Sequence, residues 1–114
     1  HIWCSTDSAD AWQPKVVQAT MGSLCRVAMH YTPDLKALLT NSHQPVYTTA
    51  MAGVSIYSQP LQPGIIIIGN EGKGVRPDLA ALATHPITIP RLGHAESLNA
   101  AVATGIVLSR LIMQ

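Results

Sequence analysis

Charged and aromatic residues are scarce in this sequence. Asp, Glu, Lys and Arg together make up 11% of its 114 residues, the net charge is +1, aromatic residues make up 4%, and phenylalanine is absent. A net charge this small creates no basic field that would attract nucleic acid by itself. The tryptophans and tyrosines are scattered, so they predict no platform on which single-stranded bases would stack. Any nucleic-acid contact must rely on charge from elsewhere or on a few individually placed Lys and Arg side chains.

Long apolar runs and metal-binding patterns are also missing. No apolar run approaches the roughly 18 residues of a membrane span, and the first residues do not resemble a secretory signal. The two cysteines, Cys4 and Cys25, form no CxxC pair, and the five histidines show no spacing such as H-E-x-x-H. No serine lies in a G-x-S-x-G elbow, which argues against a serine hydrolase. We therefore expect a cytoplasmic protein with reduced thiols, no membrane span and no bound metal.

Apolar residues, in contrast, make up 47% of the chain, a rich core and a poor polar surface for one domain of this length. A domain of this size buries about two-thirds of the surface that its unfolded chain exposes. Two interpretations remain open. Either a partner covers part of the apolar surface, as a second copy or another piece of the same protein, or the chain is a well-packed α/β monomer.

Extended and helical stretches alternate along the chain. Strands are predicted at 2–4, 24–29, 46–49, 65–68 and 86–89, and helices at 14–21, 33–39, 77–83 and 97–113. This alternation predicts an α/β fold in which helices flank a parallel sheet. The four isoleucines at 65–68 would be apolar on both faces of a strand, which favours the middle of the sheet.

Three of the predicted loops follow strands, at 49–53, 69–75 and 90–98. In open parallel sheets, ligands bind beyond the carboxyl ends of the strands. If the chain has one ligand site, these three loops should meet at it.

The second of these loops has the sequence Gly69-Asn70-Glu71-Gly72-Lys73-Gly74. It is neither a Walker A loop nor the G-x-G-x-x-G fingerprint of dinucleotide-binding folds, because its glycines are spaced differently. The plain interpretation is a strand-to-helix turn that needs positive φ angles. Glu71 is harder to explain in that way, since a turn does not require a carboxylate directly after an apolar strand.

The third loop has a plain interpretation as well, in which Glu96 or Ser97 caps the long final helix. That interpretation does not explain Asn99, which we expect inside the first turn, where its side chain would compete with the backbone. The free N–H groups of this helix terminus are suited to an oxyanion, a phosphate or the polar edge of a base. His94 is the one histidine that lies within a candidate site.

Together, these segments resemble the second and third motifs of the SpoU/TrmH class of SPOUT RNA methyltransferases. The family pattern of an apolar strand followed by Gly-x-Glu-Gly-x-Gly is matched at 65–74. The later pattern is matched by Ile87-Thr88-Ile89-Pro90, then Gly93, then Ser97-Leu98-Asn99 at the start of a helix. An upstream stretch, 14–23, resembles the family's Pro-Lys-x-x-x-Ala-x-x-Gly segment. The resemblance thus covers nearly the whole chain, with both motifs in the expected order and spacing.

The resemblance implies a parallel-sheet α/β domain with a C-terminal trefoil knot, and a homodimer packed through the knotted region. It implies transfer of a methyl group from S-adenosylmethionine to rRNA or tRNA, commonly to a ribose 2′-hydroxyl. Glu71, Ser97 and Asn99 match the family's polar catalytic positions. The positions expected to hold the cofactor are Thr49, Met51, Gly69, Ile89 and Leu98.

The sequence departs from the family pattern at two places. The first motif, Asn-x-Gly-x-x-x-Arg, should lie upstream of His1, so we expect 1–114 to be a catalytic domain that lacks its N-terminal segment and is inactive alone. The position after Ile-Pro, commonly Met, is Arg91. Two alternatives to an enzyme stay open: a non-catalytic knotted dimer that binds S-adenosylmethionine or RNA, and an unrelated α/β nucleotide-binding module.

Overall fold

A computed structural model describes residues 1–94 and 98–113 of the chain. It divides into two compact units, His1–Leu38 and Leu39–Gln114, and each is described by itself. No helix within these described residues is both long and apolar enough to cross a membrane.

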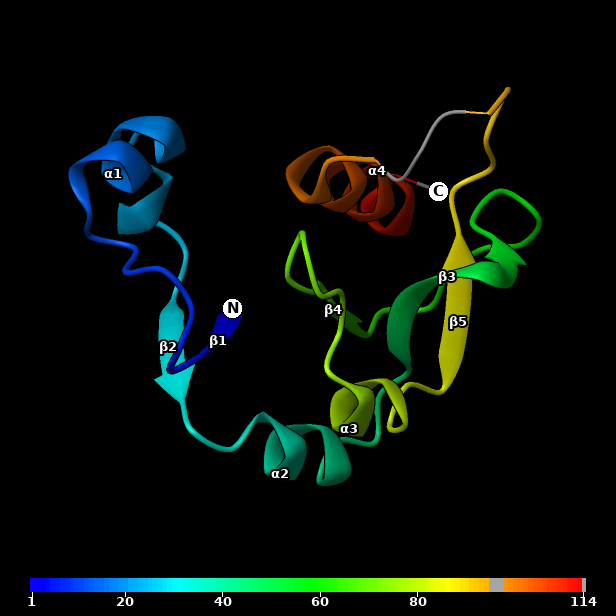
Figure 1. Ribbon diagram of the computed structural model, residues 1–114, viewed down its shortest axis with the longest axis horizontal. Helices are drawn as coiled ribbons and strands as arrows, with labels where there is room; N and C mark the ends of the chain where they lie inside the picture. Colours follow the sequence, from blue (N-terminus) through cyan, green and yellow to red (C-terminus); the bar gives the residue numbers. More distant parts are fainter. Residues whose placement is uncertain (95–97, 114) are drawn as a thin grey trace. The chain divides into compact units, whose positions relative to one another are not determined.

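The first unit contains two short parallel strands joined by a helical connection (Figure 1). Its elements are β1 (Ile2–Ser5), α1 (Pro14–Thr20), the 3-10 helix η1 (Ser23–Cys25) and β2 (Met29–Thr32). The Tyr31 hydroxyl donates a hydrogen bond to the Ala9 carbonyl at 2.8 Å and accepts one from the Ala11 N–H at 2.9 Å. These bonds tie the loop after β1 to β2. Pro14 begins α1, as predicted, because the first turn of a helix does not need its missing N–H.

The strand predicted at 24–29 is wrong. This stretch begins as η1, and the strand of this region is β2, further along the chain. The reason lies in two consecutive left-handed residues, Met21 (φ 50) and Gly22 (φ 87), which end α1 and turn the chain sharply. The Cys25 N–H then bonds the Gly22 carbonyl at 3.1 Å, and an extended conformation would break this short-range bond.

The second unit contains a three-stranded parallel sheet, which confirms the predicted parallel α/β class. Its strands are β3 (Val46–Ser55), β4 (Ile65–Ile67) and β5 (His85–Thr88), in the order β4-β3-β5. The helices are α3 (Pro77–Ala80) and α4 (Ala100–Ile112), while α2 (Leu35–Thr40) spans the boundary between the units. In Figure 1, β3 and β5 lie side by side, as their pairing requires.

The predicted central place of the isoleucine strand is also wrong. In the described part of the chain, β4 pairs only with β3 and forms an edge of the sheet. Ile67 is buried, yet Ile68 is 43% exposed. Ile68 lies just beyond β4, whose own residues are half-buried or buried, as is normal for a strand of a parallel sheet.

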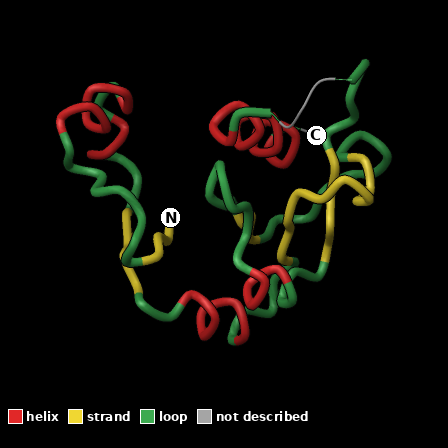
Figure 2. The backbone as a smooth tube through the Cα atoms, viewed as in Figure 1, coloured by secondary structure: helices red, strands yellow, loops and turns green. Residues whose placement is uncertain are grey.

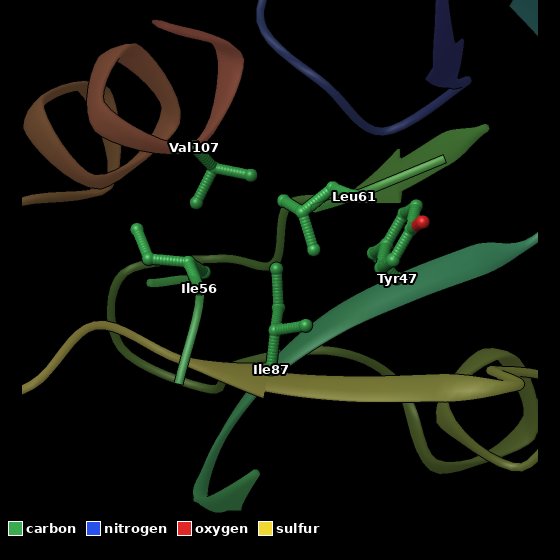
Figure 3. Close-up of a cluster of buried hydrophobic side chains, with 5 residues drawn as sticks. All are labelled: Tyr47, Ile56, Leu61, Ile87 and Val107. Atoms are coloured by element: carbon green, nitrogen blue, oxygen red, sulfur yellow. The ribbon is translucent and has the colours of Figure 1, made fainter. Parts of the chain in front are cut away.

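A cluster of buried side chains fixes α4 against the sheet. Figure 3 shows Val107 of α4 pointing toward Ile56 and Leu61, with Ile87 of β5 and Tyr47 of β3 completing the cluster. Ile56 and Val107 are fully buried. Because both strands and the helix contribute to one cluster, α4 is held against the sheet.

Candidate functional site at the strand ends

The three strands of the second unit end along one edge of the sheet. Thr48 on β3 lies opposite Ile67 on β4, and Thr49 lies opposite Ile87 on β5. Gly69 lies two residues beyond Ile67, and Ile89 lies two residues beyond Ile87. The segments that follow these strands therefore begin at the carboxyl ends of neighbouring strands, which is where ligands bind in parallel sheets.

Strand β3 is interrupted at this edge. Thr49 and Val54 both lie opposite Ile87, so the residues between them leave the regular ladder. A Cβ on Gly53 would lie 2.5 Å from the backbone carbonyl carbon of Ile87, so only glycine fits there without a shift. Met51, within this excursion, is 84% exposed. The loop predicted at 49–53 is thus an irregular segment inside a longer strand.

The glycine-rich segment between β4 and α3 is a small closed loop (Figure 2). The Asn70 N–H donates to the Gly74 carbonyl at 3.0 Å, and the Gly74 N–H donates to the Asn70 carbonyl at 2.8 Å. The Asn70 side-chain Oδ1 accepts from the N–H groups of Gly72 at 2.8 Å and Lys73 at 3.1 Å. Gly74 has φ 71, a conformation that favours glycine. We call residues 70–74 the glycine loop; it carries Glu71.

The glycine loop and the start of α4 are joined by one side-chain contact. The Asn99 Nδ2 donates a hydrogen bond to the Glu71 Oε1 at 3.3 Å, although 28 positions separate the two residues. Both side chains are exposed. Two of the predicted polar site residues, one from each motif, therefore lie next to each other.

Asn99 is the N-cap of α4, and the prediction that it lies inside the first turn is wrong. Its Oδ1 accepts from the Ala101 N–H at 2.9 Å and the Val102 N–H at 3.3 Å. These two donors fix the side-chain oxygen toward the helix, so the amide nitrogen must point away from it, toward Glu71. Asn99 thus does two things at once: it caps α4, and it offers a hydrogen-bond donor to the carboxylate.

The remaining predicted residues of the third motif lie between the end of β5 and the start of α4 in the sequence. Ile89 is half-buried and packs against the core cluster, which leaves its backbone at the strand end. Leu98, next to the cap, is 49% exposed, and Arg91 and His94 are exposed in the loop between them. Ser97 lies outside the described residues.

The charged residues after the glycine loop are partly paired. The Arg76 guanidinium donates two hydrogen bonds to Asp78, from Nε to Oδ1 at 3.1 Å and from Nη2 to Oδ2 at 2.9 Å. The hydrogen bond from Arg76 lowers the pKa of the Asp78 carboxyl below its ordinary value. The Arg76 charge is therefore partly balanced, while Lys73 is an exposed cation in the loop itself.

Two hollows in the surface of the second unit lie elsewhere. One, of about 490 Å³, runs along α4 and is lined by Val102, Ile106 and Met113 among others. The other, of about 360 Å³, lies beside Tyr47, Gln62 and His85. Neither is lined by Gly69, Glu71 or Asn99, so these two hollows are separate from the contact between the motifs.

The fold and this edge define a parallel α/β domain with its candidate site at the strand ends. The model of the SpoU rRNA methylase family matches residues 1–109. The chain belongs to this family, which confirms the resemblance deduced from the motifs.

Individual relatives agree with this assignment. The chain is 32% identical over 112 residues to the 23S rRNA (guanosine(2553)-2′-O)-methyltransferase RlmP of Bacillus subtilis, covering 91% of this chain and 44% of the relative. A protein of the TrmH family from Porphyromonas gingivalis superposes with a TM-score of 0.85 at 42% identity, over 97% of this chain and 47% of that protein. An AdoMet-bound rRNA methyltransferase from Sinorhizobium meliloti superposes with a TM-score of 0.84 at 30% identity, over 96% and 44%. The chain spans less than half the length of each.

Proposed function

We propose that the protein containing this chain is an S-adenosylmethionine-dependent RNA methyltransferase that modifies a ribose 2′-hydroxyl of rRNA or tRNA. The observation that carries the proposal is the hydrogen bond between Glu71 and Asn99, which unites the polar residues of two family motifs. The names of the relatives support both the reaction and the cofactor: RlmP methylates a 2′-oxygen, and the Sinorhizobium protein binds AdoMet. Because the proposed substrate is RNA, we also propose that the protein acts in the cytoplasm.

The strand ends are suited to holding this cofactor. Gly69 has no side chain, and the side chain of Ile89 packs toward the core, so both residues can offer backbone N–H and C=O groups. Leu98 is half-exposed beside the cap of α4 and can add apolar contact. Thr49 and Met51, both exposed, begin the excursion of β3 at the same edge. When bound, the sulfonium supplies an activated methyl group, so the reaction needs no metal.

The remaining chemistry concerns the proton of the 2′-hydroxyl, whose pKa lies far above 7. The enzyme must help to remove this proton and align the oxygen with the methyl group. In our proposal Glu71 and Asn99, and with them Ser97, orient the arginine of the first family motif and the ribose. Arg91 is an exposed cation of the third loop and belongs to the same proposed site.

We further propose that residues 1–114 are the later part of a catalytic domain, knotted at its C-terminus, and that upstream residues complete it. The terminal place of β4 in the sheet of the second unit supports this proposal, because an all-isoleucine strand is suited to a position between two other strands. The coverage of less than half of each relative supports it as well. We expect residues 1–114 alone to be inactive.

The test of the proposed function is a single-turnover assay on the full-length protein. We expect methyl transfer from labelled S-adenosylmethionine to unmodified rRNA or tRNA, with a 2′-O-methylnucleoside identified by mass spectrometry. Cofactor binding is measured in parallel by calorimetry. Binding of the cofactor without transfer to any RNA would favour the alternative, a non-catalytic knotted dimer, and absence of both would reject the proposal.

The exposed side of α4 supports a homodimer as part of the same proposal. Val102 is 52%, Leu108 41% and Ile112 72% exposed, so α4 presents several apolar side chains away from its own core. We expect the helix that carries Val102, Ile106 and Val107 to lie near or in the interface; Val107 itself is fully buried in its own chain, so it anchors the helix from the core side. Gly105 faces open space and would let a second helix approach closely.

Replacing Val102 with arginine should therefore convert a dimer of the full-length protein into a monomer. Burying an unpaired charge in an apolar interface costs several kcal/mol, enough to weaken association by roughly a hundredfold or more. The measurement is light scattering coupled to size-exclusion chromatography at micromolar concentration. Val17→Arg on α1, where valine is 39% exposed, is the control and should leave the dimer intact. A dimer that survives Val102→Arg would exclude this side of α4 from the interface.

A further inference from the structure

Asn70 is not among the residues that the motifs mark as catalytic, yet it makes four of the hydrogen bonds that close the glycine loop. Two are backbone bonds with Gly74, and two run from the N–H groups of Gly72 and Lys73 to its side-chain Oδ1. The loop these bonds close contains Glu71, whose backbone lies between the bonded atoms. The backbone on either side of Glu71 is thus fixed mainly by the hydrogen bonds of Asn70.

We infer that Asn70 is a positioning residue that fixes the Glu71 carboxylate where Asn99 can reach it. This inference rests on the proposed function, since it assigns Asn70 a role in the same site. Its side-chain oxygen satisfies two N–H groups, so the loop has one preferred conformation. At the far end of Glu71, the carboxylate meets the Asn99 amide at 3.3 Å, and a loop that moved would lose that contact.

The side chain at position 70 must meet two requirements. It needs an oxygen at the right distance to accept from the N–H groups two and three residues later, which Asn and Asp provide and Ser provides less well. It should also carry no charge beside Glu71, because a second carboxylate would repel the first. Alanine meets only the second requirement. We therefore expect the order of activity to be Asn, then Asp and Ser, then Ala.

The test uses the full-length protein and four variants: Asn70→Ala, Asn70→Asp, Glu71→Gln, and Asn70→Ala combined with Glu71→Gln. At saturating cofactor and RNA, Asn70→Ala should slow single-turnover methyl transfer by roughly ten- to a hundredfold, because displaced reacting groups lose alignment. Asn70→Asp should recover part of that loss. The combined variant should be no slower than Glu71→Gln alone, since a residue that acts through Glu71 has nothing left to position.

A second measurement does not depend on activity. Amide hydrogen exchange at Gly72 and Lys73 should be at least tenfold faster in Asn70→Ala than in wild type, because both N–H groups lose their acceptor. Asn41→Ala, at an exposed asparagine outside the site, is the control for both measurements.

Several results would overturn the inference. One is a wild-type rate in Asn70→Ala, and another is a combined variant whose loss is the product of the two single losses. Unchanged exchange at Gly72 and Lys73 would overturn it even if the protein methylated no RNA. An inactive wild type with the expected change in exchange would instead reject the proposed function and with it the positioning role of Asn70, and would leave only its structural role in the glycine loop. If Asn70→Ala does not fold, Asn70→Ser replaces it, with a smaller loss of rate and a smaller gain in exchange than alanine should give, and wild-type values of both would overturn the inference.

Discussion

Asn99→Ser should slow methyl transfer by the full-length protein by about a hundredfold while leaving α4 intact. Loss of one oriented hydrogen bond near a developing charge costs about 2–4 kcal/mol in rate. Serine is as good an N-cap as asparagine, so the helix keeps its cap. The serine hydroxyl is too short to serve the cap and also replace the amide that donates to Glu71. The measurement is the single-turnover rate, with cofactor affinity determined by calorimetry on the same preparation.

Three further variants separate the two roles of Asn99. Asn99→Ala removes both, so it should show the same slow rate and also lose about 1 kcal/mol of unfolding free energy. Asn99→Asp keeps the cap but sets a carboxylate against Glu71, so it should be slow and stable. Asn41→Ser, at an exposed site elsewhere, should change neither quantity.

A different set of results would contradict the catalytic interpretation of Asn99. If Asn99→Ser transfers methyl groups at the wild-type rate and only Asn99→Ala is less stable, then Asn99 is a helix cap and nothing more. In that case its contact with Glu71 would be a consequence of the fold.

Much of the fold follows from sequence because local chemistry determines it. Pro14 begins a helix since its φ angle is already helical, and the alternation of strands and helices predicts the parallel sheet. The register of the sheet then brings the predicted loops to one edge. The two motifs are recognised by residue type and spacing along the chain, so they can be found without knowing how the strands pair.

Other features depend on partners that the sequence pattern does not specify. The pattern at 65–68 indicates burial on both faces, but it does not say which strand lies on each side, and β4 lies at an edge. The sequence predicts too early a start for α4, because Ser97 and Asn99 are both good caps, and the bonds from Ala101 and Val102 identify Asn99 as the cap.

Asn70 shows a third kind of limit. An Asn beside Gly is typical of turns, so its residue type indicates a turn and no particular role. Its importance lies in which N–H groups its side chain meets, and these are set by the loop as a whole. The signal that could have identified it is the spacing of Asn two residues before one glycine and four before another, which suits a closed loop.

Gly69→Ala should abolish most activity and weaken cofactor binding at least tenfold. A Cβ on Gly69 would lie 2.3 Å from the Gly74 carbonyl carbon and 2.4 Å from the Val75 nitrogen, which is closer than real atoms approach. Both neighbours are backbone, so neither can move aside without opening the glycine loop. Overpacking of this kind costs about 1–3 kcal/mol, and 1.4 kcal/mol corresponds to about tenfold in affinity. Calorimetry with S-adenosylhomocysteine on the full-length variant measures the loss.

Gly72→Ala is the matched control, because the family motif contains both glycines but the structure gives them different surroundings. The nearest atom to a Cβ on Gly72 is the Asn70 Oδ1 at 3.4 Å, an ordinary contact, so cofactor affinity should stay within about twofold of wild type. Motif spacing alone predicts that both substitutions are harmful; the geometry of the loop predicts that only the first is. Equal losses in the two variants would show that the tight approach at Gly69 does not decide cofactor binding, and that the glycines serve the site in some other way.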